Sequence, residues 1–138
     1  MTYPSPIPGA RPVLVVVSDL LFRSKIDEVA RQLGLELRVA RSLEQLERHL
    51  SRGEPAVTLV DLEAETLDTS AAIRRIRAAP WGAGARIVGF AGHTNVGAIQ
   101  AGRAAGAGVV LARSAFTAQL PELLARVAEE ERGRTAGE

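Results

Sequence analysis

Short apolar blocks alternate with longer segments of helical periodicity along the whole chain. Blocks rich in β-branched residues predict buried strands at 12–17, 56–61, 86–92 and 108–112. The alternating segment 35–40 predicts a shorter strand nearer the sheet edge. Apolar residues at helical spacing predict five helices between and after these strands, at 24–34, 42–53, 69–79, 94–106 and 117–131.

Local start and stop signals support the helix assignments. Ser24 is expected to cap the first helix, and Gly34 to end it. Ser42 and Gln45 have the spacing of a capping box at the start of the second helix. Asp68 or Thr69 is expected to cap the third.

Five strands that alternate with five helices predict a doubly wound α/β domain. Its sheet should be parallel, with right-handed crossovers and helices on both faces. We expect a flexible arm at 1–11, which has three prolines and a glycine, one domain at 12–131, and a tail at 132–138. We expect no further domain in the protein.

The carboxyl ends of parallel strands are where such folds place their functional sites. Asp19, Asp61, Ala91 and Arg113 all follow or end predicted strands. A carboxylate that ends a strand could also merely cap the next turn. The sequence therefore predicts that any site lies around Asp61, with its chemistry still open.

Composition excludes several classes of site. The net charge is +1, so no bulk field favours nucleic acid or an anionic membrane. Without cysteine, the chain has no disulfide, thiolate or cysteine-based metal chemistry. The first residues resemble no export signal, and no apolar run is long enough to span a bilayer. We expect a cytoplasmic protein that binds neither nucleic acid nor membrane.

Three stretches of the chain resemble receiver domains of two-component response regulators. They are "VLVVVSD", "GAGVVLARSAF" and, most specifically, "DLEAETLDTSAAIRRIR" at 61–77. The resemblance covers residues 12–130 and implies a flavodoxin-like sheet with strand order 2-1-3-4-5 and five helices. It also implies that Asp61 is the phosphoacceptor and that Asp19, Asp61 and the carbonyl of Glu63 hold Mg²⁺.

The chain departs from the pattern of the family at several positions. Ser18 replaces one of two metal-binding acids, which leaves a weak or vestigial Mg²⁺ site. Ala91 stands where a Ser or Thr would bond the phosphoryl group, and Val110 where an aromatic residue commonly switches rotamer. Arg113 replaces the lysine that ends strand five. We expect Arg113 to pair with Asp61 or Asp19 in the resting state, partly in place of the metal.

Three functions stay open at this stage. The main prediction is a stand-alone, atypical, pseudo-receiver-like interaction module with a degraded phosphorylation site, which is not an enzyme. The second is a single-domain response regulator that accepts phosphate on Asp61 with Mg²⁺, from a histidine kinase or a small phosphodonor. The third is a flavodoxin-like enzyme or cofactor binder, although the expected nucleotide motifs are absent.

The partner is expected to be a histidine kinase or another regulatory protein. The predicted helix at 94–106 has many small side chains and few charges. In the family, the face formed by helix four, strand five and helix five often mediates dimers. Self-association through this face and ordinary packing of the helix on the sheet both remain open.

Overall fold

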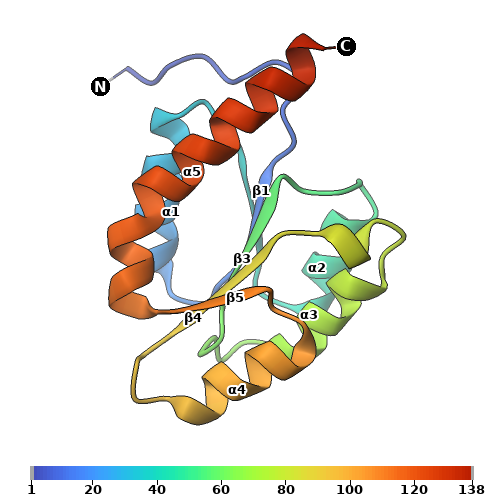
Figure 1. Ribbon diagram of the computed structural model, residues 1–138, viewed down its shortest axis with the longest axis vertical. Coiled ribbons are helices and arrows are strands. Elements are labelled where there is room, and N and C mark those ends of the chain that lie inside the picture. The colour runs from blue at the N-terminus through green and yellow to red at the C-terminus, as the bar shows by residue number, and fades with distance from the viewer. Residues whose placement is uncertain (1, 138) are drawn as a thin grey trace.

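The computed structural model describes residues 2–137, and its five strands form a single parallel sheet (Figure 1). The strand order is β2-β1-β3-β4-β5, as predicted. Because β3 and β4 lie inside the sheet, every residue of both is buried. The strands are β1 (Val13–Val16), β2 (Leu37–Ala40), β3 (Val57–Asp61), β4 (Ile87–Ala91) and β5 (Val109–Ala112).

The five predicted helices are present and cover both faces of the sheet. They are α1 (Leu20–Gln32), α2 (Leu43–Leu50), α3 (Thr69–Ala78), α4 (Val96–Ala105) and α5 (Arg113–Ala136). Figure 1 shows α1 and α5 on one face and α2, α3 and α4 on the other. A short 3₁₀ helix, η1 (Gly82–Gly84), precedes β4 and was not predicted.

Two hydrophobic clusters form the core, one on each face of the sheet. Val13 and Val15 contribute to the cluster under α1 and α5, whereas Leu14 and Val16 contribute to the one under α2, α3 and α4. Successive side chains of a strand point to opposite faces, so a strand covered on both sides needs apolar residues throughout. This requirement explains the unbroken apolar blocks in the sequence.

Helix α1 starts earlier than predicted, and this corrects the proposed cap at Ser24. Asp19 is the cap: its carboxylate accepts hydrogen bonds from the backbone N–H groups of Leu21 and Phe22. The first turn was missed because Leu20 and Leu21 are exposed and do not follow the buried stripe. The caps predicted at Ser42 and Asp68 are confirmed.

Helix α5 extends the predicted segment 117–131 at both ends and includes residues 132–136, which were expected to be tail. Pro121 lies inside the helix rather than near its first turn. It is exposed, while Phe116, Leu120 and Leu124 are buried at helical spacing on either side of it. Packing on the sheet therefore continues past the proline and offsets the hydrogen bond it removes. Within residues 2–137, no helix has both the length and the apolar composition that a membrane span requires.

The N-terminal arm, expected to be flexible, lies against the end of α1 and the C-terminal part of α5 (Figure 1). The N–H of Ile7 donates to the carbonyl of Gly34, whose φ of +75° lets the chain turn sharply after α1. Arg11 binds the buried carboxylate of Glu131 through its backbone N–H and its guanidinium. The arm thus joins the two helices that cover one face of the sheet.

Candidate functional site

The candidate site is built around Asp61, the last residue of β3, at the carboxyl edge of the sheet. In the sheet register Asp61 lies opposite Phe90, and Ala91 lies opposite Ala112 at the end of β5. The ends of these three strands are therefore level, as the sequence predicted. Only 4% of the Asp61 side chain is exposed, which is unusual for a carboxylate.

The side chain of Arg113 reaches Asp61 from the first turn of α5. Because β5 ends at Ala112 and α5 begins at Arg113, the side chain starts at the same sheet edge. Its Nη2 donates to Asp61 Oδ1 at 2.9 Å and to Glu63 Oε1 at 3.0 Å. The predicted ion pair is thus confirmed for Asp61. A single nitrogen of Arg113 thus bridges the two carboxylates.

Aromatic rings hold the guanidinium of Arg113 from the core side. Its central carbon lies 5.1 Å from the ring centre of Phe22 and 5.2 Å from that of Phe90. Phe90 in turn stacks on Phe116, with 4.1 Å between ring centres. All three phenylalanines of the chain therefore form one stack beside Arg113. Each cation–π contact contributes about 0.5–2 kcal/mol, so the rings and the carboxylates together fix the guanidinium.

Glu63 bridges the loop after β3 to the loop after β4. Its Oε1 accepts a hydrogen bond from the backbone N–H of Gly92 at 2.8 Å, and its Oε2 accepts one from Asn95 Nδ2 at 2.8 Å. These bonds, together with the one from Arg113, lower the pKa of Glu63 to about 2. The sequence suggested only the Glu63 carbonyl, as a metal ligand. In the structure its side chain is the central acceptor, and its backbone N–H donates to Asp61 Oδ1.

Asn95 and Gly92 were missed as site residues. Asn95 also accepts a hydrogen bond from the N–H of Ala98 and so caps α4. An asparagine just before a helix often has this role, so the sequence could have indicated it. Its second contact, with Glu63, has no counterpart in the sequence pattern. The backbone N–H of Gly92 could not have been identified from any residue type.

Ser18 and Asp19 lie at the carboxyl end of β1, yet neither is bonded to Asp61 by any interaction found within residues 2–137. The hydroxyl of Ser18 accepts a hydrogen bond from the N–H of Glu65 at 3.2 Å, in the loop that follows β3. The carboxylate of Asp19 caps α1 and is exposed. Ser18 thus anchors the site loop, and Asp19 serves its own helix.

Ala91 and Val110 contribute shape but no polar group. Ala91 ends β4 and is completely buried, and its methyl group can neither donate nor accept a hydrogen bond. Val110 is partly buried and packs against the cluster under α2, α3 and α4. Asp61 therefore takes its hydrogen bonds from the backbone N–H of Glu63 and from Arg113.

Burial dominates the acidity of Asp61. Desolvation raises the pKa of the Asp61 carboxyl above its ordinary value, although the N–H of Glu63 and the charge of Arg113 act in the opposite direction. Arg113 itself stays protonated, because the hydrogen bond to Glu63 and the charge of Asp61 raise its pKa against the effect of its own burial. The cluster holds one cation between two carboxylates whose pKa values are shifted in opposite directions.

A magnesium ion does not fit the side chains as they are arranged. Mg²⁺ requires oxygen ligands in near-octahedral geometry at about 2.1 Å. Asp61 Oδ1 already accepts two hydrogen bonds, one of them from Arg113, and the Asp19 carboxylate is engaged by α1. Among residues 2–137, no group of three or more Asp, Glu or His side chains could hold a metal ion. Arg113 supplies the positive charge beside Asp61.

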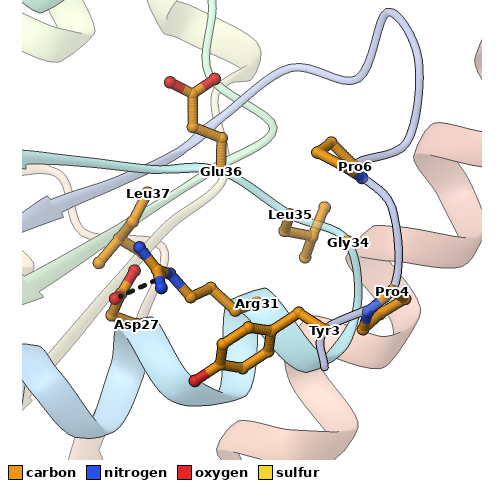
Figure 2. Close-up of a pocket in the computed structure, with 9 residues that line it drawn as sticks. All are labelled: Tyr3, Pro4, Pro6, Asp27, Arg31, Gly34, Leu35, Glu36 and Leu37. Atoms are coloured by element: carbon orange, nitrogen blue, oxygen red, sulfur yellow. Dashed lines mark ion pairs between the residues drawn. The ribbon is translucent and has the colours of Figure 1, made fainter. Parts of the chain in front are cut away.

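A separate hollow of about 390 Å³ lies between the N-terminal arm, α1 and the start of β2 (Figure 2). Tyr3, Pro4 and Pro6 of the arm line one side of it. On the helix side, Arg31 pairs with Asp27 at 3.3 Å and lies over the ring of Tyr3. These charged groups satisfy one another, and the hollow is lined by the amino end of β2 rather than by strand carboxyl ends. We therefore place the candidate site at Asp61.

Solved structures similar to this chain include receiver domains and response regulators. The receiver domain of the sensor histidine kinase PA1611 from Pseudomonas aeruginosa, which has a magnesium ion coordinated in its cleft, is 24% identical with a TM-score of 0.73. The comparison covers 88% of this chain and 99% of that one. The chemotaxis response regulator CheY4 of Vibrio cholerae is 19% identical with a TM-score of 0.71, covering 86% and 98% of the two chains.

The receiver domain of NtrX from Brucella abortus gives a similar result, with 18% identity, a TM-score of 0.69 and coverage of 85% and 98%. No protein-family model matches the sequence, and no curated protein matches it. At these identities the structural likeness establishes the fold. It confirms the flavodoxin-like architecture that the sequence predicted.

Proposed function

We propose, from the premise that this chain has the fold of a response-regulator receiver domain, that it is a regulatory protein-interaction module with a degraded phosphorylation site. Its function would then be exerted through a protein partner and not through catalysis. Asp61 would be the remnant of a phosphoacceptor.

The bond between Arg113 and Asp61 is the observation that carries this proposal. It places a permanent cation on a nearly buried carboxylate, where an incoming phosphoryl donor and its metal would need access. Ala91 adds to the effect, because it offers no hydroxyl to a phosphoryl group. A bound group can shift a conformational equilibrium only through contacts that differ between the two states, and Ala91 and Val110 would each withhold one such contact.

The face formed by α4, β5 and α5 supports a role in protein binding. Val96 of α4 is 56% exposed and Val109 of β5 is 49% exposed, values that are high for large apolar side chains. A regulatory protein, a histidine kinase or a second copy of this chain would cover them. Sedimentation velocity of the protein alone separates a homodimer from a monomer that needs another partner.

A second function is kept because one structural neighbour, the PA1611 receiver domain, holds magnesium in its cleft. In that alternative, Arg113 moves aside, Mg²⁺ binds near Asp61, and Asp61 accepts a phosphoryl group. The two functions predict opposite responses to a phosphoryl mimic.

The test is thermal unfolding of the protein alone, with Mg²⁺, and with Mg²⁺ plus beryllofluoride. A ligand that binds only the folded state raises Tm, and the rise grows with the logarithm of the ligand concentration once this exceeds the dissociation constant. We expect less than about 1 °C of change for the native chain, and a rise of several degrees with the mimic would overturn the proposal. Stabilisation by a flavin or nucleotide instead would indicate a flavodoxin-like cofactor binder.

A restored variant serves as the matched control. The triple change Ser18→Asp, Ala91→Thr and Arg113→Lys returns the residue types of the receiver pattern to the three positions. This variant should gain the beryllofluoride response that the native chain lacks. If the variant folds and still does not respond, these three positions are not the cause of the loss.

A further inference from the structure

Three N–H donors converge on one point beside Asp61, and the chain fills that point itself. The donors are the backbone N–H of Gly92, Nδ2 of Asn95 and Nη2 of Arg113, which lie 2.8, 2.8 and 3.0 Å from the carboxylate oxygens of Glu63. Two belong to the loop between β4 and α4, and the third to the first turn of α5. No sequence motif predicts this arrangement.

The chemistry of the donor set is that of an oxyanion site. The N–H of a backbone amide, the NH₂ of a side-chain amide and a guanidinium all donate, and none of these nitrogen atoms can accept a hydrogen bond. Because one donor is charged, the site prefers a negatively charged acceptor to a neutral one. A carboxylate, a phosphate or a similar small oxyanion meets these requirements.

Glu63 occupies the site as a tethered ligand. It lies two residues after Asp61, and its own backbone N–H is bonded to Asp61 Oδ1, so the loop holds its side chain close to the donors. A tethered group acts at an effective concentration of millimolar or higher, so a free anion competes with it poorly. The side chain is 31% exposed, so the site can be reached from solvent once it is vacated.

We propose that Gly92, Asn95 and Arg113 form an oxyanion-binding site, and that the carboxylate of Glu63 is its built-in ligand. The tethered carboxylate joins the β4–α4 loop to α5 without any added anion. It also keeps small oxyanions away from Asp61. This inference goes beyond the proposed function, because it concerns the donors around Glu63 and does not depend on whether Asp61 accepts phosphate.

The test removes the tethered ligand and supplies a free one. The Glu63→Ala variant is titrated with acetate and, separately, with inorganic phosphate, and unfolding is followed by thermal denaturation. We expect a lower Tm than that of the native chain, and a recovery that grows with the logarithm of anion concentration and reaches about 3–5 °C at ten times the dissociation constant. In the amide NMR spectrum, the added anion should shift the signals of Gly92 and Asn95.

Two controls separate this site from general salt effects, since phosphate stabilises many proteins by exclusion from their surface. Glu65→Ala removes an exposed acid from the same loop and should respond to the anions as the native chain does. The double variant Glu63→Ala, Arg113→Met should lose the recovery of Tm beyond that of the native chain. An equal anion response in Glu63→Ala, Glu65→Ala and the native chain would overturn the proposal. If Glu63→Ala does not fold, Glu63→Gln takes its place in the titration, with the same outcomes.

Discussion

Replacing Arg113 by Met tests how strongly the central cation holds the site together. Methionine retains much of the side-chain length and can still pack on Phe22 and Phe90, but it removes the positive charge. Asp61 then keeps one hydrogen bond from the N–H of Glu63 and loses its ion pair. Glu63 keeps its bonds to Gly92 and Asn95. Glu63 also loses its own bond from Arg113, so the contribution of Asp61 is obtained by comparison with the same change in an Asp61→Asn background.

The size of the effect follows from the burial of the two partners. Removing one member of a buried ion pair costs about 3–5 kcal/mol, because the other charge is left unpaired. Asp61 is nearly buried, but 32% of the Arg113 side chain is exposed, so water screens part of the interaction. We expect a loss of about 2 kcal/mol in the free energy of unfolding at pH 7. With a typical slope, this lowers the urea midpoint by about 1 M.

The pH dependence gives a second, independent readout. The pKa of Asp61 is already raised by burial, so the folded state binds this proton more tightly than the unfolded state. Protonation of such a group favours folding, and its contribution fades as pH rises through the folded pKa. Without Arg113 the pKa of Asp61 rises further. The loss in the free energy of unfolding caused by Arg113→Met should therefore be full at pH 7 and smaller at about pH 4.5.

Urea unfolding of Arg113→Met and the native chain at both pH values measures this difference. The double variant with Asp61→Asn is the control, because the neutral amide should remove both the penalty and its pH dependence. A loss below about 0.5 kcal/mol, the level of a surface pair, would refute the reasoning. So would a loss that is the same at both pH values.

Two further predictions concern the scaffold. Glu131→Gln should destabilise the protein by about 2 kcal/mol at pH 7, because the buried carboxylate binds Arg11 and Arg134. Burial raises the pKa of Glu131, but the hydrogen bonds from Arg11 outweigh this effect and lower it. The loss of stability measured by urea unfolding should therefore shrink as pH falls below about 4.5. The control Glu130→Gln, at an exposed ion pair, should change stability little at either pH. Gly82→Ala should cost at least about 3 kcal/mol, since its Cβ would lie 2.1 Å from the carbonyl oxygen of Ile76. Gly84→Ala, with nothing within 4 Å, should be neutral, and equal melting temperatures for the two would contradict this packing.

Much of the fold could be predicted because its determinants are local and periodic. Strands β1 and β4 have no polar side chain, and β3 has only Thr58 before it ends at Asp61, since both faces of these strands are covered, and that pattern is visible in the sequence. Boundaries were less certain where the periodic signal fails. The exposed Leu20 and Leu21 hid the first turn of α1, and Pro121 suggested a later start for α5.

The sequence by itself determined that Asp61 lies at the carboxyl edge of a parallel sheet, because strand alternation fixes which residues end there. The resemblance to receiver domains further led us to expect that Arg113 pairs with Asp61 or Asp19, and the structure shows the pair with Asp61, although β4 lies between β3 and β5. Only the tertiary structure decided where the Glu63 side chain points and which groups bind it. Loop residues follow no periodic pattern, so the sequence does not show where their side chains point. The direction of the Glu63 side chain depends on the Gly92 amide and Asn95, which lie about 30 residues later in the chain. These donors come close to Glu63 only when β4 pairs with β3.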